Sequence, residues 1–270
     1  MTINTEGNTD GTCFGDVWRD AVSTRSNATF LVFETSSGSS HSWTYAEFDN
    51  VVARAAAKLT DLGVTQGDSV NLALTNSPAF VALWLASIRL GAWIVPSDPQ
   101  SRTQELIEHQ SRTQTRVGVC SVHRKEEFLA AAQSIPVIVI DEDDCELAVF
   151  GTEKFIDWPR LNIRDRAAVM FTSGTTGRPK GVDISQANYA FSGQVMATAS
   201  GLNSDDRQLV VLPLFHANAQ YYSFASAIAV GASVALMSTF SATRFLQQAK
   251  TYAATHASLF AAPIRMILAR

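Results

Sequence analysis

Two patterns of hydrophobic residues alternate along most of this chain of 270 residues, and together they predict an α/β protein. Short apolar runs between turn-forming residues predict buried strands, whereas apolar positions three and four residues apart predict amphipathic helices. Because helical patterns separate most of the predicted strands, crossover connections and mainly parallel sheets are expected. Strands are predicted at 29–34, 41–43, 69–75, 92–95, 115–120, 137–140, 167–171, 208–212, 233–237 and 257–260. Helices are predicted at 45–62, 77–90, 101–111, 124–132, 186–199, 219–230, 243–252 and from 263 onward.

Start and stop signals define several of these helices. Thr44 and Glu47 form a capping box, since the threonine oxygen can accept a hydrogen bond from an unpaired helix N–H while the glutamate reaches back. Pro78 stands at the first position of the next helix, where its missing N–H costs nothing. Gly63 and Gly91 follow the last apolar positions and are expected to end the two helices.

The pattern divides the chain into a tail and two α/β subdomains. Residues 1–13 are expected to be a flexible tail, because the first ten are polar and lack the basic start and apolar centre of a signal peptide. Residues 14–166 form the first predicted subdomain, which ends in an irregular linking stretch with an acidic surface loop at 141–146. Residues 167–270 form the second, which is expected to be incomplete because its last helical pattern has no cap.

Composition narrows the possible functions. Hydrophobic residues make up 46% and charged residues 17% of the chain, as in ordinary globular proteins. The formal net charge of −4, without a cluster of lysines and arginines, argues against nucleic acid as a partner. The cysteines at 13, 120 and 145 are widely separated, which suggests neither a disulfide framework nor a zinc site and favours the reducing cytoplasm.

One long stretch without charge has the appearance of a membrane segment. Residues 208–243 contain no Asp, Glu, Lys or Arg. A transmembrane helix needs about 20 predominantly apolar residues, and this stretch is interrupted by Pro213, Gly231 and several polar side chains. It therefore predicts buried core, and no transmembrane segment is expected.

Residues 171–181 carry the most informative chemistry, in the order Phe-Thr-Ser-Gly-Thr-Thr-Gly-Arg-Pro-Lys-Gly. Glycines let backbone N–H groups approach phosphate oxygens closely, and hydroxyls and a lysine add further donors and charge. A strand is expected before this loop and a helix after it, whose positive end would also favour phosphate. Gly174 and Gly177 are three apart and Lys180 follows Pro179, so the spacing is not that of the common P-loop. From composition alone, a flexible linker is the alternative.

The ordered string at 171–182 closely resembles the signature loop of the adenylate-forming superfamily, which includes acyl-CoA synthetases, luciferases and the adenylation domains of peptide synthetases. Segments 43–48 and 89–99 resemble the opening helix and the second core motif of the same family. Segment 212–222 is similar to the Pro-Leu-Phe-His segment that lines its carboxylate pocket. This chain has His216 where peptide-synthetase domains usually carry an aspartate motif for an amino group, which points to an acid without an α-amino group and to a CoA ligase.

The resemblance implies a layered αβαβα arrangement of mainly parallel sheets flanked by helices, as in the N-terminal body of an adenylate-forming enzyme without its C-terminal lid. Three positions depart from the family pattern. Ala219 replaces the usual glycine three residues after the histidine, which puts the local backbone path in doubt, while Asp183 and Gln186 replace common residues after the loop. The family's Tyr-Gly-x-Thr-Glu segment, ribose-binding aspartate, hinge and lid lysine would come after residue 270.

The resemblance also implies roles for individual residues. ATP would react with a small-molecule carboxylic acid to give an acyl-adenylate, and CoA would then take the acyl group. Lys180 and His216 are the predicted catalytic residues, and Thr176 is the predicted magnesium contact. The predicted phosphate-binding residues are Thr172, Ser173, Gly174, Thr175, Thr176, Gly177 and Lys180. The predicted acid-binding residues are His216, Ala217, Asn218, Gln220 and Tyr221.

Two alternatives to a CoA ligase are consistent with the same residues. The first is an adenylating enzyme that loads an acyl-carrier protein. The second is a non-catalytic module that binds nucleotide or acyl groups, since the elements that complete the family's active site are not in this sequence.

Overall fold

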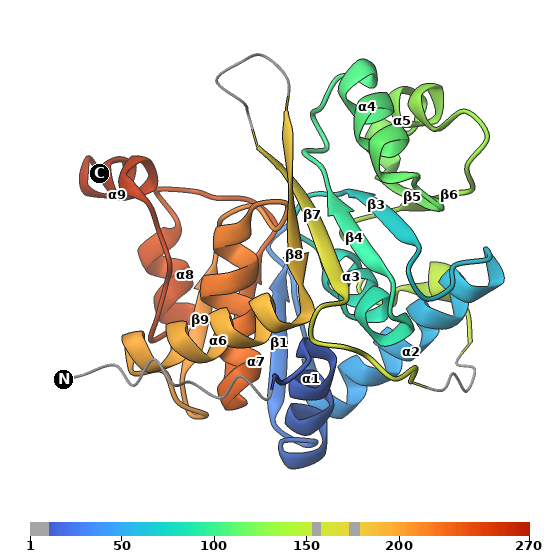
Figure 1. Ribbon diagram of the computed structural model, residues 1–270. Coiled ribbons are helices and arrows are strands. Elements are labelled where there is room, and N and C mark those ends of the chain that lie inside the picture. Colours follow the sequence, from blue (N-terminus) through green and yellow to red (C-terminus); the bar gives the residue numbers. More distant parts are fainter. Residues whose placement is uncertain (1–10, 153–157, 173–178) are drawn as a thin grey trace.

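Two mainly parallel sheets flanked by helices make up the computed structural model, which describes residues 11–152, 158–172 and 179–270 (Figure 1). In one sheet the strand order is β2-β1-β10-β9, and in the other it is β6-β5-β3-β4-β7-β8. Among the strands of the described ranges, only β2 and β8 run antiparallel to their neighbours. The predicted fold class is confirmed. The four-stranded sheet contains β1 (Thr29–Glu34), β2 (Ser40–Thr44), β9 (Arg207–Val210) and β10 (Ser233–Met237). The six-stranded sheet contains β3 (Ser69–Ala73), β4 (Trp93–Pro96), β5 (Val117–Ser121), β6 (Val137–Ile140), β7 (Arg166–Thr172) and β8 (Lys180–Ser185).

Helices cover the sheets and fill the space where they meet. Their bounds are α1 (Phe14–Thr24), α2 (Tyr45–Asp61), α3 (Pro78–Leu90), α4 (Thr103–Thr113), α5 (Lys125–Ala132), α6 (Gln186–Ser200), α7 (Ser226–Val230), α8 (Phe245–Thr251) and α9 (Ala261–Leu268). The short helices η1 (Val122–Arg124) and η2 (Ala148–Phe150) are 3₁₀ turns, and η3 (Ala219–Ala225) is a π-helix. Within the described ranges, no helix combines the length and apolar character that crossing a bilayer requires.

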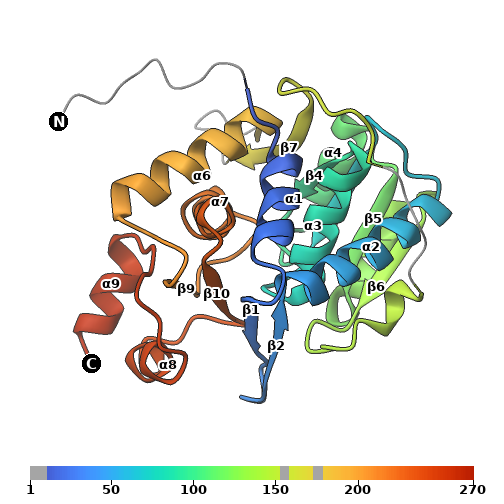
Figure 2. The ribbon, with the colours of Figure 1, turned by 90° about the horizontal axis from the view of Figure 1, so that it is seen from below.

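An aromatic cluster joins both halves of the chain in one core. Trp84 of α3 lies 5.5 Å from Phe14 of α1 and 5.2 Å from Tyr189 of α6, measured between ring centroids. Phe224 of η3 lies 6.3 Å from both Trp84 and Phe30 of β1. Figure 2 shows α1, α6 and α7 side by side, with α3 behind α1. Ring pairs of this kind stabilise a core by about 0.5–1.5 kcal/mol each beyond the area that they bury.

The sheets do not follow the predicted division at residue 166. Strand β1, from the first predicted subdomain, pairs with β2 of the same subdomain and with β10 of the second, which in turn pairs with β9. Strand β7 begins at 166 and pairs with β4 of the first. The two subdomains therefore stay a prediction, and the strand pairings run across their boundary.

Three local predictions differ from the structure. Helix α1 was not predicted, although Phe14, Trp18 and Ala21 recur at helical spacing and are buried. Residues 257–260, where a strand was predicted, form none, and the residue before them, His256, makes a single bridge to Gln208. Residues 219–225 form a π-helix where an α-helix was predicted, and an α-helix follows only at Ser226.

The acidic loop at 141–146, expected to be only a solvated surface, supports the ends of two strands. Glu142 accepts hydrogen bonds from the backbone N–H of Thr75 at 2.6 Å and from the hydroxyl of Ser121 at 2.6 Å. Thr75 follows β3 and Ser121 ends β5. The loop therefore ties together two neighbouring strands at their carboxyl ends.

Candidate functional site

The carboxyl ends of parallel strands from both sheets meet at one edge of the molecule. Asn76, just after β3, donates hydrogen bonds to the carbonyls of Leu212 and Met237, each at 3.1 Å. Its side-chain oxygen accepts the N–H of Leu214 at 2.8 Å. Leu212 follows β9 and Met237 ends β10, so one buried amide joins three strand ends. In open α/β sheets, ligands bind just outside such carboxyl ends.

Strands β7 and β8 bring the two described flanks of the predicted phosphate loop together. They form an antiparallel hairpin in which Thr172 pairs with Lys180. The hydroxyl of Thr172 also donates to the carbonyl of Lys180 at 3.4 Å, and both residues are exposed. The predicted site residues Ser173, Gly174, Thr175, Thr176 and Gly177 lie outside the described residues. Thr172 and Lys180, on either side of these residues in the sequence, therefore lie on adjacent strands at the same end of the hairpin.

The prediction that a helix follows the loop directly was wrong. Strand β8 intervenes, and α6 begins at Gln186, beside Ser185, which pairs with Arg166 at the opposite end of the hairpin. At about 3.4 Å per residue, this places the helix N-terminus roughly 17 Å from Lys180 along β8. The macrodipole of α6 acts within its first turn and cannot reach a phosphate at the loop. The alternation of apolar and polar side chains from Val182 to Ile184 was the signal for a strand.

His216 stands at the same edge as the hairpin flanks. Its backbone N–H donates to the carbonyl of Pro213 at 3.1 Å, and its ring lies 4.4 Å from that of Phe215. Partial burial lowers the pKa of His216 below its ordinary value, and the charge of Asp98, just after β4, opposes this shift. The imidazole is therefore neutral near pH 7, and a neutral imidazole can donate one hydrogen bond to a carboxylate.

The two predicted catalytic residues share the edge without touching. Among the described residues, no hydrogen bond or ion pair joins Lys180 to His216. Strand β4, which leads to Asp98, pairs directly with β7, which leads to Thr172. The carboxylate near His216 and the hydroxyl beside Lys180 therefore follow adjacent parallel strands.

The predicted acid-binding residues divide into two groups. Ala217, Asn218 and Tyr221 are half-buried, and the side-chain oxygen of Asn218 is buried without a hydrogen-bond partner among the described residues. Gln220 is fully buried, and both ends of its side-chain amide have partners. The amide N–H donates to the carbonyl of Leu214 at 2.5 Å, and the amide oxygen accepts the hydroxyl of Tyr189. Gln220 thus holds the segment that leads to His216, while Asn218 offers an unpaired acceptor.

The π-helix η3 begins three residues after His216 and contains Gln220 and Tyr221. π-Helices are rare and are frequently found at functional sites, since the extra residue in the turn displaces the side chains that follow. Burial raises the pKa of the Tyr221 phenol, which packs 5.0 Å from the ring of Tyr189. The backbone path around Ala219, which the sequence left in doubt, is therefore a π-helical turn within the predicted acid-binding residues 216–221.

Magnesium has no set of ligands among the described residues. Within those ranges, no group of three or more His, Cys, Asp or Glu side chains is placed to hold a cation. Thr176, the predicted contact, lies outside them. Magnesium therefore stays a prediction.

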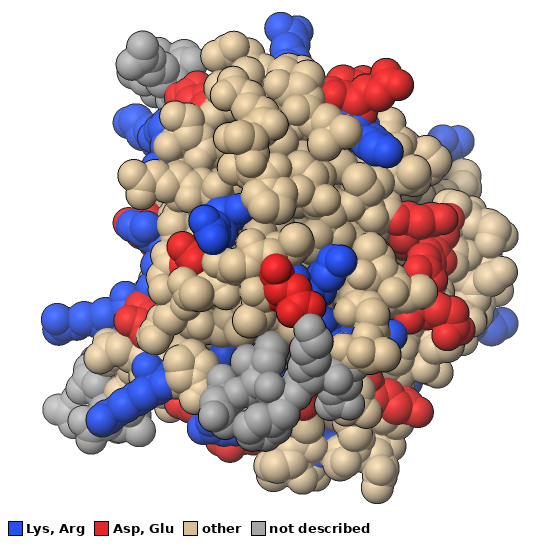
Figure 3. Space-filling model, turned by 90° about the vertical axis from the view of Figure 1, so that its right-hand side faces the viewer, with Lys and Arg blue, Asp and Glu red and all other residues tan. Residues whose placement is uncertain are grey.

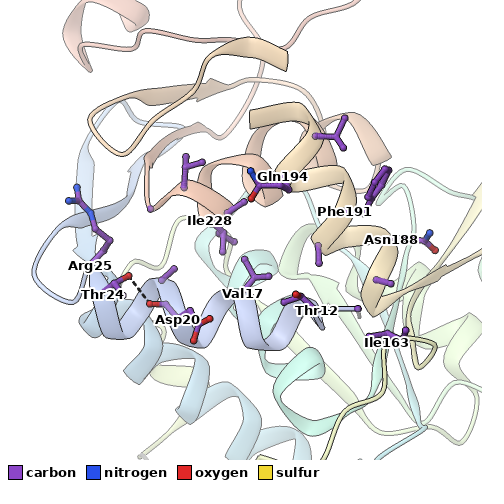
Figure 4. Close-up of a pocket in the computed structure, with 18 of the residues that line it drawn as sticks. Thr12, Val17, Asp20, Thr24, Arg25, Ile163, Asn188, Phe191, Gln194 and Ile228 are labelled. Atoms are coloured by element: carbon purple, nitrogen blue, oxygen red, sulfur yellow. Dashed lines mark hydrogen bonds between the residues drawn. The ribbon is translucent and has the colours of Figure 1, made fainter. Parts of the chain in front are cut away.

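A separate cavity of about 1180 Å³ lies between α1, α6 and α7 (Figure 4). Val17, Ile163, Phe191 and Ile228 give it an apolar lining, with Arg25 at one end. None of the predicted site residues that the structure describes lines it. The cavity is therefore distinct from the edge that carries Lys180 and His216, and we assign it no chemistry.

Charges on the face drawn in Figure 3 lie in small groups of both signs. Mixed surface charges of this kind are screened over about 10 Å at 0.1 M salt. Exposed charges more than about 10 Å from the hairpin and His216 are therefore largely screened at these residues.

Acidification is expected to destabilise the fold through His109, a buried residue of α4 beside the hairpin. Burial is the main cause that lowers its pKa below the ordinary 6.5; Glu105 and Glu108 oppose the shift and Arg112 adds to it. The unfolded chain therefore binds a proton more readily, and stability is lost as the pH falls from about 6.5 through the folded pKa. Urea unfolding at pH 7.5 and 5.5 should show this loss.

The control for this expectation is His109→Gln, which keeps a hydrogen-bonding side chain but cannot titrate. Its free energy of unfolding should fall less between the two pH values, although His216 contributes a loss of the same sign. An equal pH dependence in the wild type and in this variant would remove His109 as a cause.

Comparison with known proteins identifies the family. Residues 18–270 match the model of the AMP-binding enzyme family, and the chain belongs to that family. A crotonobetaine/carnitine–CoA ligase from Salmonella arizonae is 30% identical over 266 residues, which cover 93% of this chain and 52% of that protein. The chain thus spans about half the length of the curated relatives that it matches.

Solved structures support the fold. A long-chain-fatty-acid–CoA ligase from Archaeoglobus fulgidus superposes with a TM-score of 0.85 at 21% identity, over 95% of this chain and 53% of that one. ATP-bound MatB from Rhodopseudomonas palustris gives a TM-score of 0.76 at 22% identity, over 86% and 47%. The two-sheet arrangement is that of the N-terminal part of acyl-CoA synthetases.

Proposed function

We propose that this chain is the N-terminal part of an ATP-dependent acid–CoA ligase. The observation that carries the proposal is the β7–β8 hairpin, which pairs Thr172 with Lys180 on either side of the predicted phosphate loop. His216 lies at the same carboxyl edge of the sheets. Membership of the AMP-binding enzyme family supports ATP as the nucleotide.

The first half-reaction would join the acid to AMP. A carboxylate oxygen attacks the α-phosphorus of ATP, the bond from this phosphorus to the β-bridging oxygen breaks, and pyrophosphate leaves with that electron pair. Two anions must meet, so the reaction needs orientation and charge neutralisation. Lys180 supplies a positive charge and Thr172 a hydroxyl donor from adjacent strands, which suits the β- and γ-phosphates.

His216 would orient the acid without transferring a proton. Its lowered pKa keeps the imidazole neutral, so it offers one N–H donor to a carboxylate or to the acyl-adenylate. In the second half-reaction, the sulfur of CoA attacks the acyl carbon, its proton goes to solvent, and AMP leaves. The relatives named as CoA ligases support CoA as the acceptor.

The acid is proposed to be small and polar, without an α-amino group. Asn218 has an unpaired buried oxygen that can accept a hydrogen bond from such a substrate. The relative from Salmonella arizonae is named for crotonobetaine and carnitine. We propose a cytoplasmic enzyme, in keeping with the three unpaired cysteines.

His216→Ala is expected to raise the KM for the acid about tenfold, because the loss of one oriented hydrogen bond costs about 1–1.5 kcal/mol. The KM for ATP should change less than twofold. Pyrophosphate release, measured across a panel of carboxylic acids, reports both constants. His123→Ala removes an exposed histidine of η1 and serves as the matched control.

The same assay separates the alternatives. If His216→Ala and His123→Ala have equal KM values for the acid and equal KM values for ATP, the assigned role of His216 is excluded. Transfer to a carrier-protein thiol but not to CoA would indicate the carrier-loading enzyme. ATP binding without acid-dependent pyrophosphate release would favour a nucleotide-binding module.

A further inference from the structure

Helix α4 contacts both strands of the β7–β8 hairpin. The imidazole of His109 stacks on Phe171 of β7, with ring centroids 4.0 Å apart and an interplanar angle of 9°. Arg112, three residues further along the same helix face, donates to the carbonyl of Pro179 at 2.6 Å. Phe171 and Pro179 each stand one residue before a predicted phosphate-binding residue. One turn of α4 thus holds both flanks of the predicted loop.

The guanidinium of Arg112 joins the two flanks in a single contact. It lies 5.0 Å from the ring centroid of Phe171 while it donates to Pro179. Glu108 accepts from the same nitrogen at 3.1 Å, which limits the motion of the side chain. A planar guanidinium can stack and donate at once, whereas the ammonium of a lysine cannot stack in this way.

A buried polar network fixes the orientation of His109. Its Nδ1 lies 2.9 Å from the hydroxyl of Ser97, which in turn accepts from the amide of Asn71 at 2.9 Å. Gln110 donates to the oxygen of Asn71 at 3.1 Å. All four residues are buried, and they extend from β3 through the end of β4 to α4. The ring that stacks on Phe171 is therefore positioned by the centre of the sheet.

The segment that follows β4 connects this support of the hairpin with His216. Ser97 is followed by Asp98, whose charge acts on His216. The segment after β4 therefore contacts the support of the hairpin at one residue and influences His216 from the next. No residue of α4 was singled out from the sequence, because His109 and Arg112 read as ordinary positions of an exposed helix.

We propose that His109 and Arg112 are positioning residues that hold Phe171 and Pro179 so that Thr172 and Lys180 contact the same triphosphate. This proposal rests on the proposed function of the hairpin. Neither residue touches the substrate in this scheme. Their effect is on how well the two flanking donors are aligned before ATP binds.

The test is ATP binding by the 270-residue chain, measured by titration calorimetry. Arg112→Ala should raise the Kd for ATP about tenfold, which corresponds to about 1.4 kcal/mol. Arg112→Lys should give an intermediate value, because it retains a donor for Pro179 without the stacking. Arg116→Ala removes an arginine that donates to the carbonyl of Gly63 at 3.0 Å, away from the hairpin, and should leave the Kd unchanged.

Hydrogen exchange of β8 without nucleotide provides the second readout. Amides at 180–182 should exchange at least tenfold faster in Arg112→Ala than in Arg116→Ala. Unchanged Kd and unchanged exchange in Arg112→Ala, or equal changes in both variants, would overturn the proposal. If Lys180→Ala still weakens ATP binding in that case, the proposed function stands. If Lys180→Ala leaves ATP binding unaffected, the proposed function itself fails.

Discussion

Replacement of Lys180 by alanine is expected to lower acid-dependent pyrophosphate release by 10²–10³-fold, the loss typical of removing one preorganised charge-stabilising group from a reacting centre. Lys180 stands at the start of β8 and pairs with Thr172 at the loop end of the hairpin. Charge on the leaving pyrophosphate increases in the transition state, so turnover should fall more than ATP affinity. Coupled detection of pyrophosphate and calorimetric ATP titration measure the two effects.

Lys250→Ala is the matched control for this substitution. Lys250 is an exposed lysine in the last turn of α8 and has no assigned role. Its loss changes the net charge by the same amount and should alter neither constant by more than twofold. Equal rates in both variants, with the fold intact by circular dichroism, would contradict the assignment of Lys180 to the phosphates.

Local signals predicted the helix ends well because they depend on residues close in sequence. The capping box at Thr44 is present, since its hydroxyl accepts the N–H of Glu47 at 3.2 Å and Glu47 accepts the N–H of Thr44 at 2.7 Å. Gly91 ends α3 in the left-handed conformation at φ 67°. Such contacts span three or four residues, so the sequence pattern contains them in full.

Strand order could not be predicted because it depends on distant partners. β1 lies between β2 and β10 in the sheet. β2 follows β1 closely in the sequence, whereas β10 comes about 200 residues later. β8 was missed for a related reason. Most of its residues are exposed, and the only sequence signal is the short alternation from Val182 to Ile184, so its pairing with β7 defines the strand.

Some residues of the candidate site could be predicted from neighbouring sequence, whereas others depend on partners far away in the chain. The residues from Thr172 to Lys180 and His216 could be proposed because each belongs to a recognisable string. Asn76 and His109 could not, since a short polar residue after a strand and a histidine in an amphipathic helix are common. Their importance comes from partners in other elements, which the structure alone reveals.

Asn76 illustrates how much of the site depends on one such residue. It is 4% exposed and makes three hydrogen bonds to backbone groups at the ends of β9 and β10. Those backbone groups have been removed from water. If Asn76 were replaced, each would lose its partner in a place that solvent cannot easily enter, and an unpaired buried polar group costs about 1–3 kcal/mol.

Asn76→Ala is therefore expected to lower the free energy of unfolding by about 3–5 kcal/mol, since several buried groups lose their partner together. Urea unfolding at pH 7.5 measures the change. Asn203→Ala, which removes an exposed asparagine that donates to Asp206 at 2.6 Å, should cost less than about 1 kcal/mol. Because the N–H of Leu214 precedes His216 by two residues, surviving Asn76→Ala protein should also bind the acid more weakly. A loss below about 1 kcal/mol would mean that other contacts hold the two sheets together at this edge.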